Sequence, residues 1–316
     1  MIVNADGNIL LSIVSPVYQA ENTIKELVRR IDQAAAKITD KYEIILVEDR
    51  SFDDSWLKIV EVASSNPRVR GARLSRNYGQ HAAITAALSL SKGEHVVVID
   101  CDLQHDPGDI QLLYNNAVGG HDIVLARHPN RQHAPSRNIG AAFFCWIMTL
   151  FSGEKQLDTN LSGFSILSRK VVDAFLRFNE SHRHFLHIVS WMGFSVSYVD
   201  ILHHERLQGK SSYTIKSLIR HALHGIIGQS TRLLHLSILM GFMYFIASII
   251  GIIYVLARYF FWGLKEGWAS GIVLLLASTG SILLSLGIIG LYIGSIYEQV
   301  RGRPLFLIDE TANFSL

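Results

Sequence analysis

Hydrophobic and polar positions divide the chain into a first part with short apolar runs and a last part with long ones. In the first part, apolar runs rich in β-branched residues alternate with segments of helical periodicity, and these runs cover residues 10–15, 43–47, 69–74, 95–100 and 122–126. Short apolar runs between helical segments are typical of strands that are buried on both faces of a parallel sheet. The pattern therefore predicts an α/β domain with a mostly parallel sheet.

Two helix starts can also be read from the sequence. Thr23 and Glu26 have the spacing of a capping box, and they open an apolar stripe that spans residues 24–38. Pro107 directly follows Asp106, which predicts a second helix with the proline at its first position.

The last part of the chain contains two long runs without a charged residue, at residues 236–257 and 267–297. A helix of roughly 20 apolar residues spans the core of a bilayer, so these runs predict transmembrane helices at 236–257 and 269–297. The alternative, two buried helices of a soluble protein, is rare for runs of this length. Basic residues precede the first run and follow the second, which predicts that both termini are cytoplasmic and that residues 258–268 form a non-cytoplasmic loop.

Residues 206–235 separate the first domain, residues 1–205, from the first predicted span. Between positions 215 and 227, isoleucines and leucines recur at helical spacing, and lysine, arginine and histidine lie between them. This spacing predicts amphipathic, basic helices on an anionic membrane surface, with packing against the soluble domain as the alternative. Residues 298–316 are expected to form a cytoplasmic tail.

Composition agrees with this division of the chain. The 316 residues are 49% hydrophobic and only 18% charged, and the mean hydropathy is +0.25. A formal charge of +2 gives no support to a nucleic-acid partner bound through bulk positive charge. Two cysteines are too few for a disulfide framework. The first residues lack the pattern of a secretory signal, so the soluble domain is expected in the cytosol.

Acidic and polar residues follow several of the predicted strands. Asp49 follows the second strand, and Asp100, Asp102 and Gln104 follow the fourth. In open α/β sheets ligands bind at the carboxyl ends of the strands, so these residues are candidates for the chemistry. Two nearby carboxylates favour a divalent cation, and their oxygens suit Mg²⁺ or Mn²⁺. For the Asp-x-Asp alone a solvated turn is the alternative, but its place after a buried strand favours the metal.

Several motifs along nearly the whole chain resemble membrane-anchored family-2 glycosyltransferases with a GT-A fold. The resemblance is to the group that transfers sugars to polyprenyl phosphate, which contains dolichol-phosphate mannose synthases, bactoprenol glucosyltransferases and undecaprenyl-phosphate aminoarabinose transferases. The motifs lie at residues 16–18, 48–51, 74–81, 100–104, 206–213 and 301–304. The more specific ones are Arg-Asn-Tyr-Gly-Gln at 76–80 and Arg-x-x-Gly-x-Ser-x-Tyr at 206–213.

The resemblance implies a role for individual residues. The metal and the donor diphosphate are expected at Asp100, Asp102 and Gln104. The donor-binding residues are expected to be Pro16, Tyr18, Glu21, Asp49, Arg76, Gly79, Gln80, Asp100 and Asp102. The acceptor phosphate is expected at Arg127, Arg131, Arg137 and Ser211. The catalytic residues are expected to be Asp100, Asp102, Arg127, Arg137 and Arg206. Guanidinium groups bind phosphate oxygens bidentately, although each arginine has a solvated surface position as its alternative.

By the same resemblance the protein transfers a hexose, expected to be UDP-linked, to undecaprenyl phosphate with inversion at the cytoplasmic face of the inner membrane. The product would serve cell-surface glycan or lipopolysaccharide modification, and the enzyme would be a homo-oligomer, a dimer or a tetramer. The alternatives are a processive polysaccharide synthase and a catalytically silent nucleotide-binding scaffold.

This chain departs from the group's pattern at several positions. Ala20 stands where many of these synthases have Glu, and Ser162 to Ser165 replace a more usual Gly-Asp-Phe-Arg. Arg50 replaces a common glycine, which places the loop geometry in question because glycine tolerates a positive φ and arginine does not.

Overall fold

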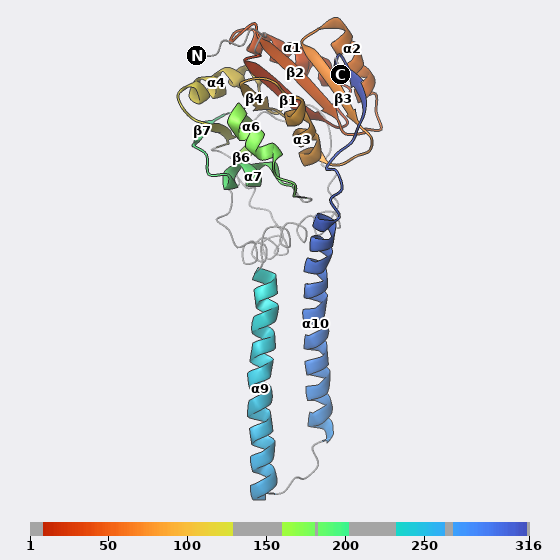
Figure 1. Cartoon of the computed structure of the whole chain (residues 1–316), viewed down its shortest axis with the longest axis vertical. Coiled ribbons are helices and arrows are strands. Elements are labelled where there is room, and N and C mark those ends of the chain that lie inside the picture. Colours follow the sequence, from red (N-terminus) through yellow and green to blue (C-terminus); the bar gives the residue numbers. More distant parts are fainter. Residues whose placement is uncertain (1–8, 129–159, 181–182, 202–231, 263–267, 315–316) are drawn as a thin grey trace, which may run out of the picture. The chain divides into compact units, whose positions relative to one another are not determined.

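The structure is a computed structural model that describes residues 9–128, 160–180, 183–201, 232–262 and 268–314 (Figure 1). The chain forms two compact units. One unit is built from residues 1–133, 157–211 and 303–316, and the other from residues 134–156 and 212–302. The C-terminal residues therefore belong to the same unit as the N-terminal domain.

A mixed sheet forms the centre of the first unit. Its strands are β1 (Leu11–Val17), β2 (Tyr42–Glu48), β3 (Val69–Leu74), β4 (His95–Val98), β5 (Ile123–Arg127), β6 (Leu161–Ser168), β7 (Val196–Asp200) and β8 (Ile308–Ala312). Among the described residues their order is β7-β5-β6-β4-β1-β2-β3-β8. β1 runs parallel to β2 and β4, β2 to β3, and β5 to β7. β6 is antiparallel to β4 and β5, and β8 is antiparallel to β3.

The five strands expected from the sequence are all present, as β1 to β5. Four of the seven strand pairs among the described residues are parallel, as expected, but the sheet is mixed, because β6 inserts between β4 and β5 in the opposite direction and β8 closes one edge antiparallel to β3. The sequence pattern does not predict β6, β7 or β8. The α/β class itself is correct.

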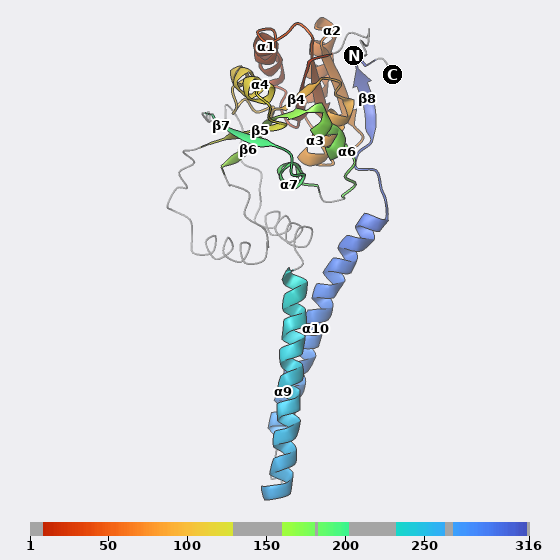
Figure 2. The same ribbon diagram turned by 60° about the vertical axis from the view of Figure 1, so that its left-hand side comes forward.

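Helices cover both faces of the sheet (Figure 2). On one face lie α1 (Ile24–Ala35), α2 (Ser55–Ser65) and α4 (Ile110–Val118), which pack against side chains such as Ile13 and Leu46. On the other lie α3 (Gln80–Leu90), α6 (Arg169–Leu176) and α7 (Phe185–Trp191), which pack against Val14 and Ile45. Successive strand residues point to opposite faces, so a strand covered on both faces must be apolar throughout.

Both predicted helix starts are confirmed, but the capping box expected at the first is absent. Asp106 caps the short 3-10 helix Pro107–Asp109 by accepting a hydrogen bond from Gly108 N at 2.9 Å, with the proline at the first position. At α1, Thr23 holds the N-cap position but makes no side-chain cap bond. Its hydroxyl donates to the carbonyl of Cys101 at 2.8 Å, and this bond replaces the expected capping box.

The second unit contains two long apolar helices, α9 (Arg232–Trp262) and α10 (Trp268–Val300), which contact each other. Among the described residues, the segment Ala277–Val300 of α10 is long and apolar enough to cross a membrane. α9 carries a shorter apolar segment, Ser237–Gly251. One candidate span is therefore present where the sequence predicts two. The predicted amphipathic helices fall almost entirely on residues 202–231, outside the described part of the chain.

A buried polar cluster joins β1 and β2 to the turn before β4, at the edge where these strands begin. Ser12 Oγ donates to Glu43 Oε1 at 2.6 Å and accepts a hydrogen bond from Gly93 N at 2.8 Å. Glu43 also pairs with Arg70 at 2.6 Å, so its buried carboxylate is neutralised. A Cβ at Gly93 would lie 2.6 Å from the backbone nitrogen of Ser12, which leaves no room for a side chain.

We expect Gly93→Ala to lower the free energy of unfolding by about 1–3 kcal/mol, because the added methyl group overpacks a site bounded by backbone. Denaturant unfolding of the full chain in detergent measures the change. The exposed neighbour provides the control: Lys92→Ala should stay within about 0.5 kcal/mol of the wild type. Equal stability of the two variants would contradict this account of the cluster.

Candidate active site

Loops that follow three neighbouring strands lie at one edge of the sheet. β1 is paired in parallel with both β2 and β4, with Val17 opposite Glu48 and Val14 opposite Val98. Because these strands run in the same direction, their carboxyl ends share one edge. The loops at this edge are residues 18–22, 49–54 and 99–106. The predicted residues Tyr18, Asp49 and Asp100 are therefore brought to a common rim.

Short polar side chains join the first two loops through backbone amides. Ser51 Oγ accepts a hydrogen bond from Gln19 N, and Ser55 Oγ accepts one from Ala20 N, each at 2.9 Å. Glu21 Oε2 accepts the amide of Asp54 at 3.1 Å, while Glu21 N donates to Asp53 at 3.2 Å. Glu21, which the sequence analysis places in the donor site, thus joins the two loops.

Asp49 is the carboxylate that organises the rim. It is 3% exposed. Its Oδ1 accepts the amide of Tyr78 at 2.7 Å, and its Oδ2 accepts the amide of Gly79 at 2.8 Å. Burial raises the pKa of Asp49 above its usual value, while these two backbone bonds act in the opposite direction. Asp49 therefore holds the loop before α3 in place, which is a structural role beside the donor-binding role expected from the sequence.

The loop held by Asp49 leads directly to the Asp-x-Asp residues. Gly79 has a φ of 92°, a conformation that favours glycine, and it is the N-cap residue of α3. The next residue, Gln80, donates from Nε2 to Asp100 Oδ1 at 2.7 Å. The specific motif at residues 76–80 thus connects a buried carboxylate at the end of β2 with an acidic residue after β4.

Asp100 and Asp102 lie in a tight loop after β4. Leu103 is buried with a φ of 58°, and the amide of Gln104 donates to Asp102 Oδ1 at 3.2 Å. Among the described residues, no group of three or more His, Cys, Asp or Glu side chains is arranged to hold a metal ion. Two hard carboxylates fit Mg²⁺ or Mn²⁺ when the substrate's phosphates and water supply the other ligands. The donor set therefore fits a substrate-bridged cation.

A buried pair of imidazole rings lies against this loop. His105 and His128 are 5% and 7% exposed, and their rings stack with centroids 5.4 Å apart. Ser162 Oγ lies 2.7 Å from His105 Nε2, which fastens the loop to the start of β6. A Cβ at the adjacent Gly163 would lie 3.8 Å from Asp100 Oδ2. The serine and glycine that depart from the group's usual pattern thus border the metal-binding candidates.

The predicted phosphate-binding residues fall into two groups. Arg127, the last residue of β5, donates from Nε to Asp200 Oδ1 at 2.7 Å, and this bond holds the pKa of Asp200 below its usual value. Arg131, Arg137, Arg206 and Ser211 lie outside the described residues, so their predicted roles stay predictions.

The remaining predicted donor residues differ in exposure. Pro16 is buried within β1, and Tyr18 is 41% exposed beside it. The Arg76 guanidinium lies over the Tyr78 ring, 4.3 Å from its centroid. Arg76 is exposed, so its charge is accessible at the rim.

The roles of several rim residues were not predicted from the sequence. In the sequence, Ser51, Asp53 and Ser55 give only a weak indication that they bridge the two loops, since small polar residues before a helix are common as helix caps. Arg50 donates to Asp309 at 2.6 Å across 259 positions of sequence, which no local pattern indicates. Its φ of 53° means that the loop keeps the positive φ expected of the glycine that Arg50 replaces.

Residues 12–176 match the family model described as glycosyl transferase family 2. This match covers more than half of the chain, and it includes β1 to β6 and the loops of the candidate site. The chain belongs to glycosyl transferase family 2. It is therefore a glycosyltransferase, and the α/β fold with its mixed sheet is GT-A-like.

Relatives of this family-2 glycosyltransferase match it over almost its whole length. An uncharacterized glycosyltransferase of Bacillus subtilis, YkcC, is 33% identical over 96% of this chain and 94% of its own. The undecaprenyl-phosphate 4-deoxy-4-formamido-L-arabinose transferases of Pseudomonas fluorescens and Klebsiella pneumoniae are 32% and 30% identical, each over 95% of this chain and over 89% and 92% of their own.

Among solved structures, the glucosyl-3-phosphoglycerate synthase of Mycobacterium tuberculosis, in complex with Mn²⁺ and UDP-glucose, matches with a TM-score of 0.47. It is 18% identical, over 69% of this chain and 77% of that chain.

The two bonds of Asp49 can be tested through the amides that it accepts. Asparagine offers one acceptor oxygen in place of two, so Asp49→Asn should accelerate hydrogen exchange at Tyr78 or Gly79 by about tenfold or more, the equivalent of one lost buried hydrogen bond. Mass spectrometry of peptides covering residues 76–81 measures this. Ser75→Ala removes the hydroxyl that lies 3.0 Å from the Tyr78 hydroxyl but leaves both Asp49 acceptors in place, so it should leave the exchange of these amides unchanged. Slow exchange in both variants would contradict the role of Asp49.

Cys101, between the two aspartates, is expected to be unreactive. Burial raises the pKa of its thiol to about 12, so the thiol form predominates at pH 8. We expect iodoacetamide at pH 8 to label Cys101 far more slowly in the folded chain than in guanidinium, as measured on the peptide that contains it. Equal labelling rates in the two conditions would contradict the protection of Cys101 by burial.

Proposed function

We propose that this family-2 glycosyltransferase transfers one sugar, from a UDP-linked hexose, to undecaprenyl phosphate at the cytoplasmic face of the membrane. The observation that carries the proposal is the rim itself: Gln80 holds Asp100 beside Asp102, and Asp49 fixes the loop that carries Gln80. Relatives that match over 95% of the chain are named as undecaprenyl-phosphate transferases, which supports the lipid acceptor.

The donor would bind across the three loops of the rim. The proposed nucleoside side of the site contains Pro16, Tyr18 and Glu21, with Asp49 and Arg76 beyond them. Gly79 leaves its position without a side chain, with nothing within 4 Å of an added Cβ, so a diphosphate could approach the backbone there. Asp100, Asp102 and Gln104 would hold Mg²⁺ or Mn²⁺, which neutralises the charge that develops on the leaving diphosphate.

The acceptor phosphate needs cationic groups but no strong general base. A phosphate monoester is already anionic near neutral pH, so its oxygen attacks the anomeric carbon directly while the nucleoside diphosphate leaves, with inversion. The proposed ligands of this phosphate are Arg127, Arg131, Arg137 and Ser211, with Arg206 near the donor or acceptor phosphates. Arg127 already binds the Asp200 carboxylate, and an acceptor phosphate would share or replace that partner. Catalysis then rests on holding two anions in line.

The last part of the proposal concerns the membrane, where the proposed site meets its lipid substrate. We infer that α9 and α10 both span the inner membrane, which makes the enzyme multi-pass with its catalytic domain and both termini in the cytosol. Basic residues at both ends of the helical pair support this orientation. The head group of the acceptor lies at the membrane surface, so an anchored enzyme meets it without a search through solution. A homo-oligomer, dimer or tetramer, is part of the same proposal.

Product mass provides the direct test. Purified protein is incubated with undecaprenyl phosphate, Mg²⁺ and a panel of nucleotide sugars, and the lipid products are weighed. Addition of one hexose is the expected result. Longer chains would indicate a processive synthase, and no product with any donor would indicate a silent scaffold, so either outcome overturns the proposal.

In the same assay we expect Asp102→Asn to reduce the transfer rate by about 10²- to 10³-fold, since it removes one charge that stabilises the leaving diphosphate. Asp106→Asn is a matched control from the same loop, because asparagine also caps the helix that Asp106 begins. It should retain the wild-type rate. Near wild-type transfer by Asp102→Asn with Mg²⁺ present would remove Asp102 from the metal site.

A further inference from the structure

The C-terminal strand β8 reaches the same edge of the sheet as the candidate site. It runs antiparallel to β3, with Ala312 opposite Gly71 and Ile308 opposite Leu74. The first residues of β8 therefore lie at the carboxyl end of β3, where the backbone of Leu307 accepts the amide of Ser75 at 2.9 Å. Residues that follow α10 in sequence thus contribute to the rim.

Asp309 of β8 binds the loop that follows β2. Its Oδ2 accepts a hydrogen bond from Arg50 Nη1 at 2.6 Å, and the two side chains are 44% and 40% exposed. Arg50 lies between Asp49, which holds the loop before α3, and Ser51, which holds the loop after β1. The ion pair therefore attaches β8 to the loop that carries Asp49 and Ser51.

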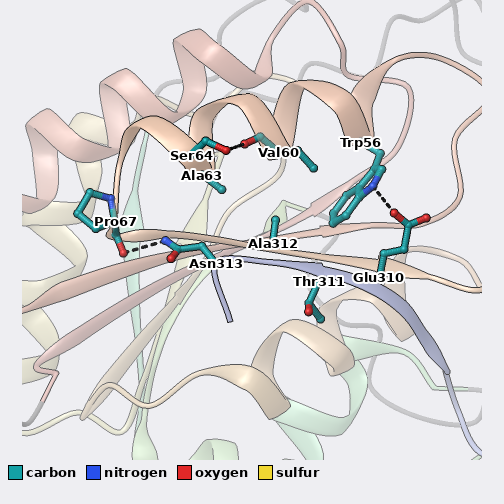
Figure 3. A pocket seen from close by; sticks show the side chains of 9 residues that line it. All are labelled: Trp56, Val60, Ala63, Ser64, Pro67, Glu310, Thr311, Ala312 and Asn313. Atoms are coloured by element: carbon teal, nitrogen blue, oxygen red, sulfur yellow. Dashed lines mark hydrogen bonds between the residues drawn. The ribbon is translucent and has the colours of Figure 1, made fainter. Parts of the chain in front are cut away.

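Glu310 reaches the same loop by a second route. It accepts a hydrogen bond from Trp56 Nε1 at 2.9 Å (Figure 3). It also accepts one from Arg73 Nη1 at 3.1 Å. Arg73 Nε also donates to Glu48 Oε2 at 3.1 Å, and Glu48 is fully buried. The other oxygen of Glu48 accepts the amide of Ser51. A continuous chain of polar contacts thus leads from β8 to the donor loop.

The opposite end of β8 has a different set of contacts. Asn313 Nδ2 donates to the carbonyl oxygens of Pro67 at 3.1 Å and Val69 at 2.7 Å, at the beginning of β3. A strand that only covers the edge of a sheet would depend on both of its ends alike. Asp309 and Glu310 make side-chain contacts toward the rim, whereas Asn313 at the other end of β8 contacts only backbone carbonyls. This difference between the two ends favours a positioning role for the acidic residues over simple protection of the sheet edge.

We propose that Asp309 and Glu310 are positioning residues for the donor-binding loop 49–52. This inference rests on the proposed function, because it assigns a nucleoside diphosphate to that loop. Seven residues, 301–307, separate the end of α10 at Val300 from the start of β8 at Ile308, so a short covalent link connects the apolar helix to the strand that binds the donor loop.

Two measurements on the full chain in detergent test the proposal. The first is the Kd of UDP with Mg²⁺ by calorimetry, and the second is hydrogen exchange of residues 49–53. For the double variant Asp309→Asn/Glu310→Gln we expect a Kd about three- to tenfold higher, because each exposed charge pair contributes modestly, and faster exchange in the loop. Asn313→Gly, which loosens the other end of β8 and keeps its φ of 59°, should change neither quantity.

Changes at Arg50 separate the ion pair from the backbone conformation. Glycine suits the positive φ at this position, so Arg50→Gly should bind UDP as well as the wild type if only the backbone matters. The proposal expects weaker binding, and it expects the exchanged pair Arg50→Asp/Asp309→Arg to recover within about twofold of the wild type, because the attraction is regained.

The outcomes discriminate between the proposals. Unchanged UDP binding and loop exchange in the double variant, or an equal effect of Asn313→Gly, would overturn the positioning role. A wild-type chain that binds neither UDP nor GDP would refute the proposed donor site instead, and hydrogen exchange alone would then decide whether β8 orders the loop.

Discussion

The two hydrogen bonds that Asp49 accepts from backbone amides determine the arrangement of the active site. A buried carboxylate is costly unless its oxygens are satisfied, and Tyr78 and Gly79 supply one donor to each of them. The loop before α3 is therefore fixed from its inner side, and Gln80 comes within hydrogen-bond distance of Asp100. The loop after β4 that carries the Asp-x-Asp residues is thus held, at Asp100, through a residue that follows β2.

The rim is built largely from side chain to backbone bonds, and this suits a site that is proposed to bind two anions. Ser51, Ser55 and Glu21 accept amides from the neighbouring loop, so backbone groups join the first two loops directly. Donors fixed before substrate binds need no reorganisation when charge moves during the reaction. Arg76 remains exposed at the rim, whereas Arg127 is held by Asp200 until an anion competes for it.

The sequence predicts β1 to β5 well because most residues of these strands are buried, which gives each one a largely apolar run. β6 includes several small polar residues, and β8 lies at an edge with acidic side chains exposed, so neither shows such a run. The rule that ligands bind at strand ends correctly brings Asp49, Asp100 and Asp102 together. The pairs Gln80–Asp100 and Arg50–Asp309 depend on distant segments, and no local pattern contains them.

At Arg50, hydrogen bonds of the neighbouring residues, rather than the distant ion pair, set the backbone conformation. A left-handed φ costs a residue with a Cβ about 1–2 kcal/mol, whereas an exposed ion pair contributes only about 0.2–1 kcal/mol. The pair with Asp309 is therefore too weak to impose a φ of 53° by itself. The residues on either side supply the remainder, since the amide of Asp49 donates to Val17 O at 2.9 Å and that of Ser51 to the buried Glu48. The flanking hydrogen bonds set the backbone conformation of Arg50. From this conformation the arginine side chain reaches Asp309 of β8, the strand that follows α10.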